Sequence, residues 1–224
     1  MNFDNFTYYR MMEESLKEIK KEDKKPTLLL HSCCAPCNAY PLVLLIEYFD
    51  LTLMYNNSNI YPFEEYNRRL NELKDYVDYI NKTHNVNIKL IETPYKNEEY
   101  NKNLEPYKEQ KEGLDRCKLC YKIRMDEAYK YASDNNFDYF TTVMTISRQK
   151  NSIVLNNIGL ELQEKYKNTK YFISDFKKNK GIDKGLEIAK ERNMYRQDYC
   201  GCIYSYNKRK RSCKKINWWI FIDL

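Results

Sequence analysis

The chain has 224 residues, of which 42% are hydrophobic and 31% are charged, values typical of a globular protein with one sizeable core. Its 38 basic and 32 acidic residues give a formal net charge of +6, which is compatible with a polyanionic partner but does not require one. No apolar run approaches the roughly 20 residues of a membrane-spanning helix, and the N-terminal segment lacks the apolar part of a secretory signal. These features argue against membrane and exported proteins, and we expect a cytoplasmic protein.

Segments with helical hydrophobic spacing alternate along the chain with short apolar or alternating segments. In chain order the expected elements are a helix over 8–24, a strand over 27–31, a helix over 38–49, a strand over 51–56, a helix over 64–84, a strand over 86–93, a helix over 117–135, a strand over 137–144, a helix over 152–166, a strand over 170–176 and a helix over 184–193. The polar stretch over 94–113 has no expected element. Such alternation indicates a mostly parallel α/β sheet flanked by helices. In sheets of this kind, ligands bind beyond the carboxyl ends of the strands.

The eight cysteines are the most informative residues of the chain. In a protein without an export signal they are expected to stay reduced, so a disulfide framework is not expected. Seven of them form three clusters, and the first cluster directly follows the first expected strand. The clusters are Cys33, Cys34 and Cys37; Cys117 and Cys120; and Cys200 and Cys202. Seven clustered thiols indicate metal or redox chemistry, whereas the isolated Cys213 fits a small buried hydrophobic residue.

The spacing within the first two clusters suits a chelating site. Cys33 and Cys34 can serve one site only where the chain turns, and the following Ala-Pro pair supplies a turn. Cys117 and Cys120 lie one helical turn apart, the usual spacing for zinc or an iron–sulfur cluster. A purely structural zinc site accounts for four thiols but leaves three without a role.

The third cluster, Cys200-Gly201-Cys202, is tighter than a C-x-x-C pair. Its glycine lets the backbone curl around a metal, or lets the two thiols close into a strained disulfide that is easily reduced. His31 adjoins the first cluster, and it is either a proton donor or support for a metal ligand, or a residue packed beneath the loop. The spacing alone leaves these alternatives open.

Basic residues mark two candidate contacts with an anionic partner. The segment "TTVMTISRQKN" places Arg148 and Lys150 between a strand and the start of a helix, where phosphate groups bind, although solvated charges beside a capped helix fit equally well. The C-terminal "KRKRSCKKINWWIFIDL" suits either a nucleic-acid tail or a solvated run before a short docking segment.

Six blocks, "LLLHSCCAPC", "SNIYPFEEYNRR", "RCKLCYKIRM", "FTTVMTISRQKN", "DFKKNKG" and "YRQDYCGCIYS", together resemble the QueH-type epoxyqueuosine reductases over Leu28–Ser205. The resemblance implies a Rossmann-like, nucleotide-hydrolase-like α/β fold. We expect one domain over 1–224, with a core over 28–205, an N-terminal helix within 1–25 and a basic, aromatic tail over 207–224. The implied activity is the last step of queuosine biosynthesis, the cobalamin-independent reduction of epoxyqueuosine to queuosine at the wobble position of tRNA anticodons.

The resemblance also implies a [4Fe-4S] cluster. Its implied ligands are Cys33, Cys34, Cys117 and Cys120. Cys200 and Cys202 become the redox-active catalytic couple, and Cys37 is left to bind a second metal. In another division, four thiols hold the cluster and three hold a mononuclear iron, which zinc can replace in isolated protein. An external electron donor is the second implied partner.

An anticodon base must leave its stack to reach such a site, and an unstacked loop is recognised through aromatic stacking and phosphate contacts. The cations in or beside the matching blocks are the candidate tRNA contacts. They are Arg68, Arg69, Arg116, Arg124, Arg148, Lys150, Lys177 and Lys178.

Two other classes of function are compatible with parts of the sequence. A nucleotide-dependent tRNA thiolation-type transferase of similar fold would need a glycine-rich phosphate loop after the first strand, and that position reads Cys-Cys-Ala-Pro-Cys. A zinc-stabilised RNA-binding module without catalysis would be colourless and contain zinc only.

Overall fold

A computed structural model describes residues 4–210. Five parallel strands form one sheet in the order β3-β2-β1-β4-β5, which confirms the expected parallel α/β architecture. The strands are β1 (Thr27–His31), β2 (Asp50–Tyr55), β3 (Lys89–Glu92), β4 (Tyr139–Thr142) and β5 (Lys170–Tyr171). The direction of strand addition reverses between β1 and β4, so the carboxyl end of β1 lies at the topological switch point, where open α/β sheets bind their ligands.

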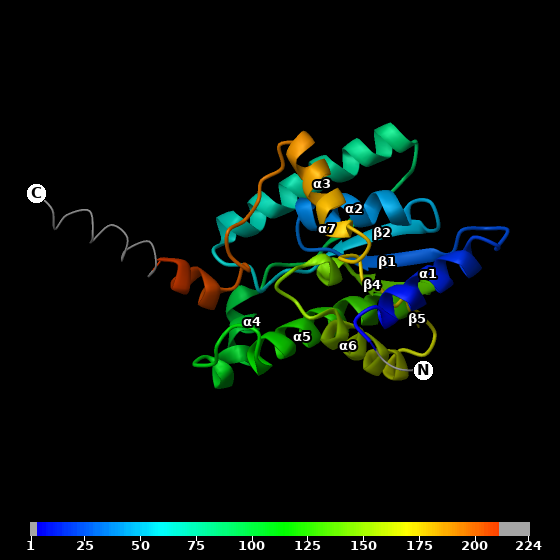
Figure 1. Ribbon diagram of the computed structural model, residues 1–224. Coiled ribbons are helices and arrows are strands. Elements are labelled where there is room, and N and C mark those ends of the chain that lie inside the picture. Colours follow the sequence, from blue (N-terminus) through cyan, green and yellow to red (C-terminus); the bar gives the residue numbers. More distant parts are fainter. Residues whose placement is uncertain (1–3, 211–224) are drawn as a thin grey trace, which may run out of the picture.

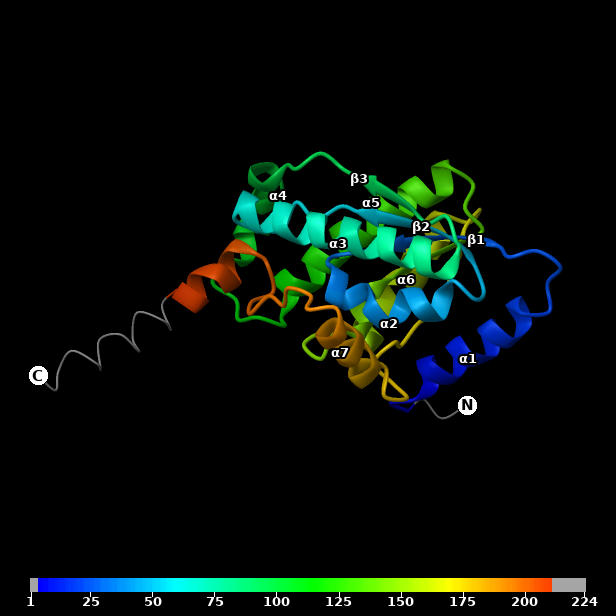
Figure 2. The ribbon, with the colours of Figure 1, turned by 90° about the horizontal axis from the view of Figure 1, so that it is seen from above.

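Helices cover both faces of the sheet (Figures 1 and 2). One face carries α1 (Thr7–Ile19), α2 (Ala35–Leu45), α3 (Phe63–His84) and α7 (Gly181–Glu191), and the other carries α4 (Asn97–Leu104), α5 (Asp115–Asp134) and α6 (Ser152–Lys165). Successive residues of β1 point to opposite faces, as the pleat requires. Leu28 and Leu30 therefore join the first core and Leu29 joins the second. Burial on both faces explains why β1 is a continuous apolar run.

The start of α2 differs from the expected helix over 38–49, and the difference matters for the site. The chain leaves β1, passes through three residues and begins α2 at Ala35, with a proline in the first turn. Proline suits this position because its missing N–H would have no partner inside the helix. Cys37 therefore lies within the first turn of α2, directly after Cys33 and Cys34.

Other elements differ from the expected ranges by a few residues at their ends, for example α1, which ends at Ile19 and not at 24, and two further differences are larger or have a clear cause. The strand expected over 170–176 ends at Tyr171, because the side chain of Asn156 accepts a hydrogen bond from the N–H of Ser174 and donates one to its carbonyl oxygen. These bonds replace a strand partner for that residue. The polar stretch over 94–113 contains α4, in which Tyr100 and Leu104 are buried.

After α7 the chain crosses the end of α3, and residues 203–210 form a final helical segment, drawn in red in Figure 1. Most of the basic, aromatic tail over 207–224, including Cys213, lies outside the described residues. Within residues 4–210, no helix combines the length and the apolar content needed to cross a bilayer.

Candidate metal centre and active-site cavity

The first cysteine cluster lies at the carboxyl end of β1 in a loop that is held from several sides. The hydroxyl of Ser32 donates to Asn38 at 3.0 Å, and Asn38 donates to the carbonyl oxygen of Cys34 at 2.8 Å. From the loop after β2, the amide of Asn57 donates to the carbonyl oxygen of Ser32 at 2.8 Å. These bonds within the protein hold the backbone of Cys33 and Cys34 in position.

The three sulfur atoms of this loop lie within 4.8 Å of one another, and all three thiols are free. The Sγ atoms of Cys34 and Cys37 are 2.8 Å apart, and those of Cys33 and Cys34 are 3.8 Å apart. Hydrogen bonds from the Cys34 and Cys37 thiols hold the pKa of Cys33 well below its usual range, and the hydrogen bonds that Cys37 makes with Cys33 and Cys34 raise the pKa of Cys37. A close group of thiols with one favoured thiolate fits a soft metal such as iron or zinc. The expected cysteine-rich cluster is therefore present at the strand ends, and it could hold a metal ion.

The second cluster lies at the start of α5. The Sγ atom of Cys117 accepts a hydrogen bond from the N–H of Gly113 at 3.2 Å, and Cys120 is buried. Burial raises the pKa of both thiols, and the nearby Cys200 thiol raises them further. The second and third clusters are thus electrostatic neighbours. The described residues contain no group of three or more candidate metal ligands within 4.8 Å other than the first cluster.

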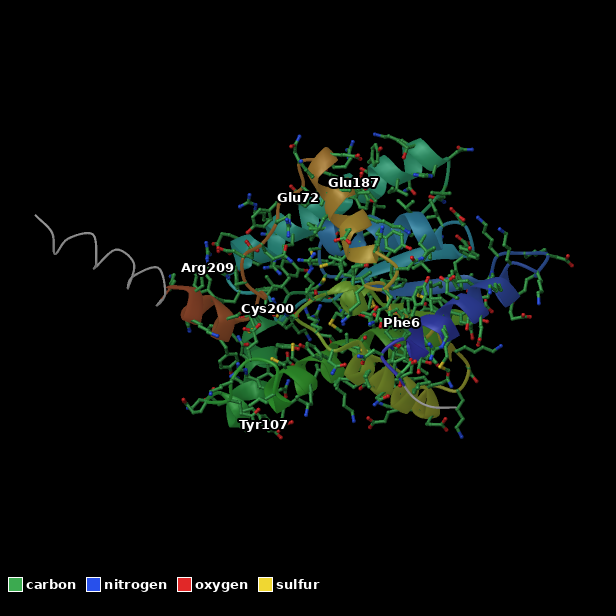
Figure 3. All side chains as sticks on the ribbon, in the orientation of Figure 1. Phe6, Glu72, Tyr107, Glu187, Cys200 and Arg209 are labelled. Atoms are coloured by element: carbon green, nitrogen blue, oxygen red, sulfur yellow. The ribbon has the colours of Figure 1, made fainter. Side chains whose placement is uncertain are left out.

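The third cluster is held against α3 by its backbone. Arg69 donates from Nη1 to the carbonyl oxygen of Cys200 at 3.3 Å, and the carbonyl oxygen of Gly201 accepts from the N–H of Tyr61 at 2.8 Å. Gly201 has a φ of +117°, and a Cβ there would lie 2.9 Å from Nη1 of Arg69. The glycine is therefore required by the conformation and by the close approach. In Figure 3, Cys200 and Arg209 lie near each other on this C-terminal segment.

A cavity of about 550 Å³ opens at this edge of the sheet, and residues from several widely separated segments of the chain line it. Its sulfur-bearing lining residues are Cys33, Cys37 and Cys200. The charged residues of its wall are five cations and two carboxylates, namely Arg69, Arg124, Lys150, Lys208, Arg209, Glu112 and Asp198. Because cations outnumber carboxylates, the cavity suits an anionic occupant.

Arg124 and Lys150 place positive charge beside the cysteine thiols. Neither has a carboxylate within 4.0 Å among residues 4–210, although Arg124 is only 3% exposed. Burial works against the charged form of Lys150, but the thiols of Cys200 and Cys33 raise its pKa above the ordinary value. Buried cations are stable only beside compensating negative charge. The donor set therefore fits a metal–thiolate group, which carries negative charge.

The predicted tRNA contacts divide into exposed and enclosed cations. Arg68 is exposed and its guanidinium lies over the ring of Tyr195, at 3.3 Å from the centroid. Arg148 is exposed and is 3.7 Å from a carboxylate oxygen of Asp183. Lys178 is half-buried, with its ammonium 4.4 Å from the centroid of the Phe6 ring.

The other candidates have partners inside the protein. Arg69 is 2% exposed and forms an ion pair with Glu65 at 2.7 Å. Lys177 donates to the carbonyl oxygen of Lys150 at 2.7 Å. Arg116 is also buried, and it donates to main-chain carbonyl oxygens of the preceding loop. The structure thus gives Arg69, Lys177 and Arg116 bonds that position loops of the site, and leaves Arg68 and Arg148 open to solvent.

His31 lies beneath the loop. It is fully buried, its Nδ1 is 2.8 Å from the hydroxyl of Thr142, and burial holds its pKa well below the usual value. The structure therefore favours the packing alternative for His31, and a neutral ring.

Several residues that line the cavity were not predicted as site residues from the sequence. They are Asn57, Asn59, Tyr121 and Gln197. The amide of Gln197 donates to Sγ of Cys34 at 3.3 Å. The run of asparagines after the second strand was the available signal for the first two, because it stands at a strand end. Gln197 lies at the cavity because the C-terminal segment passes there, and no local sequence pattern predicts that path.

Fold and site together define a class of protein, the Rossmann-like α/β proteins with a metal-capable thiol site at the carboxyl edge of the sheet. Comparison with known proteins identifies the family within that class. Residues 28–208 match the family model described as epoxyqueuosine reductase QueH. The chain belongs to this family and is an oxidoreductase.

Three relatives illustrate how far the similarity extends, and each is named epoxyqueuosine reductase QueH. The relative from Streptococcus pyogenes serotype M1 is 39% identical over 198 residues, which are 88% of this chain and 77% of the relative. The relative from Staphylococcus aureus is 34% identical over 219 residues, or 97% and 91% of the two chains. The relative from Thermotoga maritima is 31% identical over 194 residues, or 85% and 96%.

Proposed function

We propose that this chain reduces epoxyqueuosine to queuosine at the wobble position of tRNA in the cytoplasm, with the reaction taking place in the cavity at the carboxyl end of β1. The observation that carries the proposal is that Cys33 and Cys37, from the β1–α2 segment, and Cys200, from the C-terminal segment, line one cavity. Membership of the QueH family supports the reaction and the substrate.

In this proposal Cys33, Cys34, Cys117 and Cys120 hold a [4Fe-4S] cluster, and Cys37 is available to a second iron, which zinc can replace. When bound, these groups supply single-electron transfer and a Lewis acid. The close sulfurs of the β1–α2 loop support the assignment of Cys33 and Cys34. Two cations beside the thiols, the buried Arg124 and the half-buried Lys150, support an anionic group.

The electron balance assigns a role to the third cluster. Opening an epoxide to an alkene with loss of water requires two electrons and two protons. Oxidation of the Cys200 and Cys202 thiols to a disulfide releases two electrons and two protons, so dithiol and epoxide give disulfide, alkene and water. An external dithiol reductant then restores the pair by thiol–disulfide exchange. Arg69 and Gly201 hold the backbone of this pair against the cavity.

Lys150 and Arg124 have a second role toward the substrate. Both line the cavity, and both remain charged at neutral pH. They therefore orient the oxygen that gains negative charge as the epoxide opens. Arg68 and Arg148 contact tRNA phosphates from outside the cavity. Replacing Arg148 with Gln is expected to weaken tRNA binding and to reduce its salt dependence, and an unchanged slope would remove Arg148 from the interface.

The first experiment is an absorption spectrum of protein purified without oxygen, with iron, sulfide and zinc counted on the same sample. About four irons with four sulfides, and a broad band near roughly 400 nm that dithionite bleaches, are expected. The same protein should convert epoxyqueuosine-containing tRNA to queuosine-containing tRNA, measured by nucleoside analysis. A colourless protein that holds only zinc after anaerobic reconstitution would refute the assignment of the cluster.

Cysteine variants separate the two roles. Cys200→Ser is expected to keep its iron and sulfide and to lose turnover, whereas Cys33→Ser is expected to lose iron as well. Cys213→Ser is the matched control, because Cys213 lies beyond the residues that match the family, and it should keep both metal and turnover. Full turnover by Cys200→Ser would contradict the redox role of the pair.

A further inference from the structure

Three tyrosines from two distant segments meet beside the cavity. Tyr61 precedes α3, whereas Tyr199 and Tyr206 flank the Cys200–Cys202 pair. The ring centroids of Tyr61 and Tyr206 are 5.4 Å apart, and those of Tyr199 and Tyr206 are 5.6 Å apart. The hydroxyl of Tyr199 donates to the carbonyl oxygen of Tyr61 at 2.6 Å. The rings therefore form one fixed group, and we call it the tyrosine platform.

The platform carries positive charge on the side of the final helical segment. The ammonium of Lys210 lies 4.6 Å from the centroid of the Tyr206 ring, and the guanidinium of Arg209 lies 5.7 Å from that of Tyr199. Arg209 is itself oriented by an ion pair of 2.6 Å with Asp198. Arg209 and Tyr199 both line the cavity, so the platform reaches the cavity wall.

Burial distinguishes this group from the aromatic residues that fill the core. Tyr129 and Phe140 also pack against each other, but they are fully buried. All three platform tyrosines are only half-buried. A tyrosine that served only to anchor the C-terminal segment would gain more by full burial.

Aromatic rings with adjacent cations are the combination that binds single-stranded nucleic acid, because each base offers a face for stacking and each phosphate a charge. A base that enters the cavity must leave its stack, and this also leaves the neighbouring base without a stacking partner. We propose that the tyrosine platform binds the nucleotide adjacent to the target nucleotide, with the base on Tyr206 and the phosphate near Arg209 and Lys210. This inference rests on the proposed function insofar as it takes RNA as the substrate.

The test uses a short synthetic hairpin RNA that reproduces an anticodon loop with an unmodified guanine at the wobble position. The fluorescent analogue aminopurine replaces the base on either side of that guanine in turn. Wild-type protein should bind the hairpin and change the fluorescence from one of the two positions. Tyr206→Leu is expected to weaken binding about 5- to 150-fold and to abolish the fluorescence change, because a stacked base is lost. Tyr206→Phe keeps the ring and should behave as wild type.

Tyr107→Leu is the control, since Tyr107 is exposed and lies on another part of the surface, below the C-terminal segment in Figure 3. It should bind the hairpin as wild type does. Lys210→Gln should reduce the slope of log K against log salt by about 0.7, the value for one phosphate contact in single strands. Circular dichroism and iron content confirm that each variant is folded and loaded.

The outcomes separate this inference from the proposed function. The hairpin carries no epoxide, so Tyr206-dependent binding without reduction of epoxyqueuosine-containing tRNA would support the platform and refute the activity. Reduction with unchanged hairpin binding by Tyr206→Leu would support the activity and refute the platform. If Tyr206→Leu instead slowed only the re-reduction of the cysteine pair by an external protein reductant, the surface would be a docking face for that protein, and the platform would also be refuted.

Discussion

Replacing Arg69 with Met should destabilise the protein strongly, and the structure gives the size of the effect. Nε of Arg69 is 2.7 Å from the Glu65 carboxylate, and the two side chains are 3% and 10% exposed. Removing one partner of a buried ion pair costs about 3–5 kcal/mol of unfolding free energy, because the other charge stays buried without its partner. Among residues 4–210, Glu65 would keep only the hydroxyl of Tyr195, at 2.9 Å. The bonds from Arg69 to the carbonyl oxygens of Tyr199 and Cys200 are long, 3.4 and 3.3 Å, and add less than about 1 kcal/mol each.

The assay is urea unfolding without oxygen of wild type, Arg69→Met, Glu65→Met and the double variant. Metal content is measured in each sample, because bound metal adds to stability. The double variant leaves no unpaired charge, so it should regain most of the loss, and the cycle gives the coupling energy. Lys122→Met, which breaks the exposed pair with Glu161, is the control and should change stability by less than about 1 kcal/mol. A loss below about 1 kcal/mol for Arg69→Met, or no recovery in the double variant, would refute the reasoning.

Three further predictions follow from single contacts. Gly201→Ala places a side chain at a φ of +117° and a Cβ 2.9 Å from Arg69, so we expect a loss of about 1–3 kcal/mol in urea unfolding; full stability would show that the loop adapts. Lys177→Met removes the bond to the Lys150 carbonyl oxygen and should lower kcat for tRNA reduction without changing the salt slope of binding, and a flatter slope would make Lys177 a phosphate contact. Burial raises the pKa of Asp175 above 3.8, so its contribution to stability is fully present below that pH and is lost as pH rises through the raised pKa. Asp175→Asn lacks this titration, so its unfolding free energy relative to wild type should be higher at about pH 7 than at about pH 4, and equal differences would contradict the shift.

The sequence was sufficient for the sheet and for the position of the first cysteine cluster. Leu28–Leu30 is apolar without alternation, which only a strand buried on both faces requires, and a strand of that kind lies inside a parallel sheet. Once β1 is placed in such a sheet, the residues that follow it lie at the ligand-binding edge. The position of Cys33 therefore followed from local pattern and topology alone.

The residues that line the cavity could not be predicted from the sequence in the same way, because the lining depends on contacts between segments that are distant in the chain. Arg69 and Arg68 are adjacent in sequence, and both appeared as phosphate contacts, yet one is buried against Glu65 and the other is exposed. Arg69 lies on the buried face of α3, but the carbonyl oxygens that it binds there, those of Tyr199 and Cys200, come from the C-terminal segment. The grouping of Tyr61 with Tyr206 has the same origin, since no periodicity relates residues so far apart in the chain.

Arg124 and Lys150 connect the fold to the chemistry. An arginine that is 3% exposed and has no carboxylate within 4.0 Å among the described residues would be costly beside neutral thiols. The cost disappears when the neighbouring sulfurs are thiolates, because Arg124 and Lys150 then stabilise them. The same two charges favour addition of an electron to whatever the thiolates bind, since reduction adds negative charge next to a fixed positive one. Two residues that are not themselves ligands thus place positive charge beside the thiols, which favours a bound group that carries negative charge.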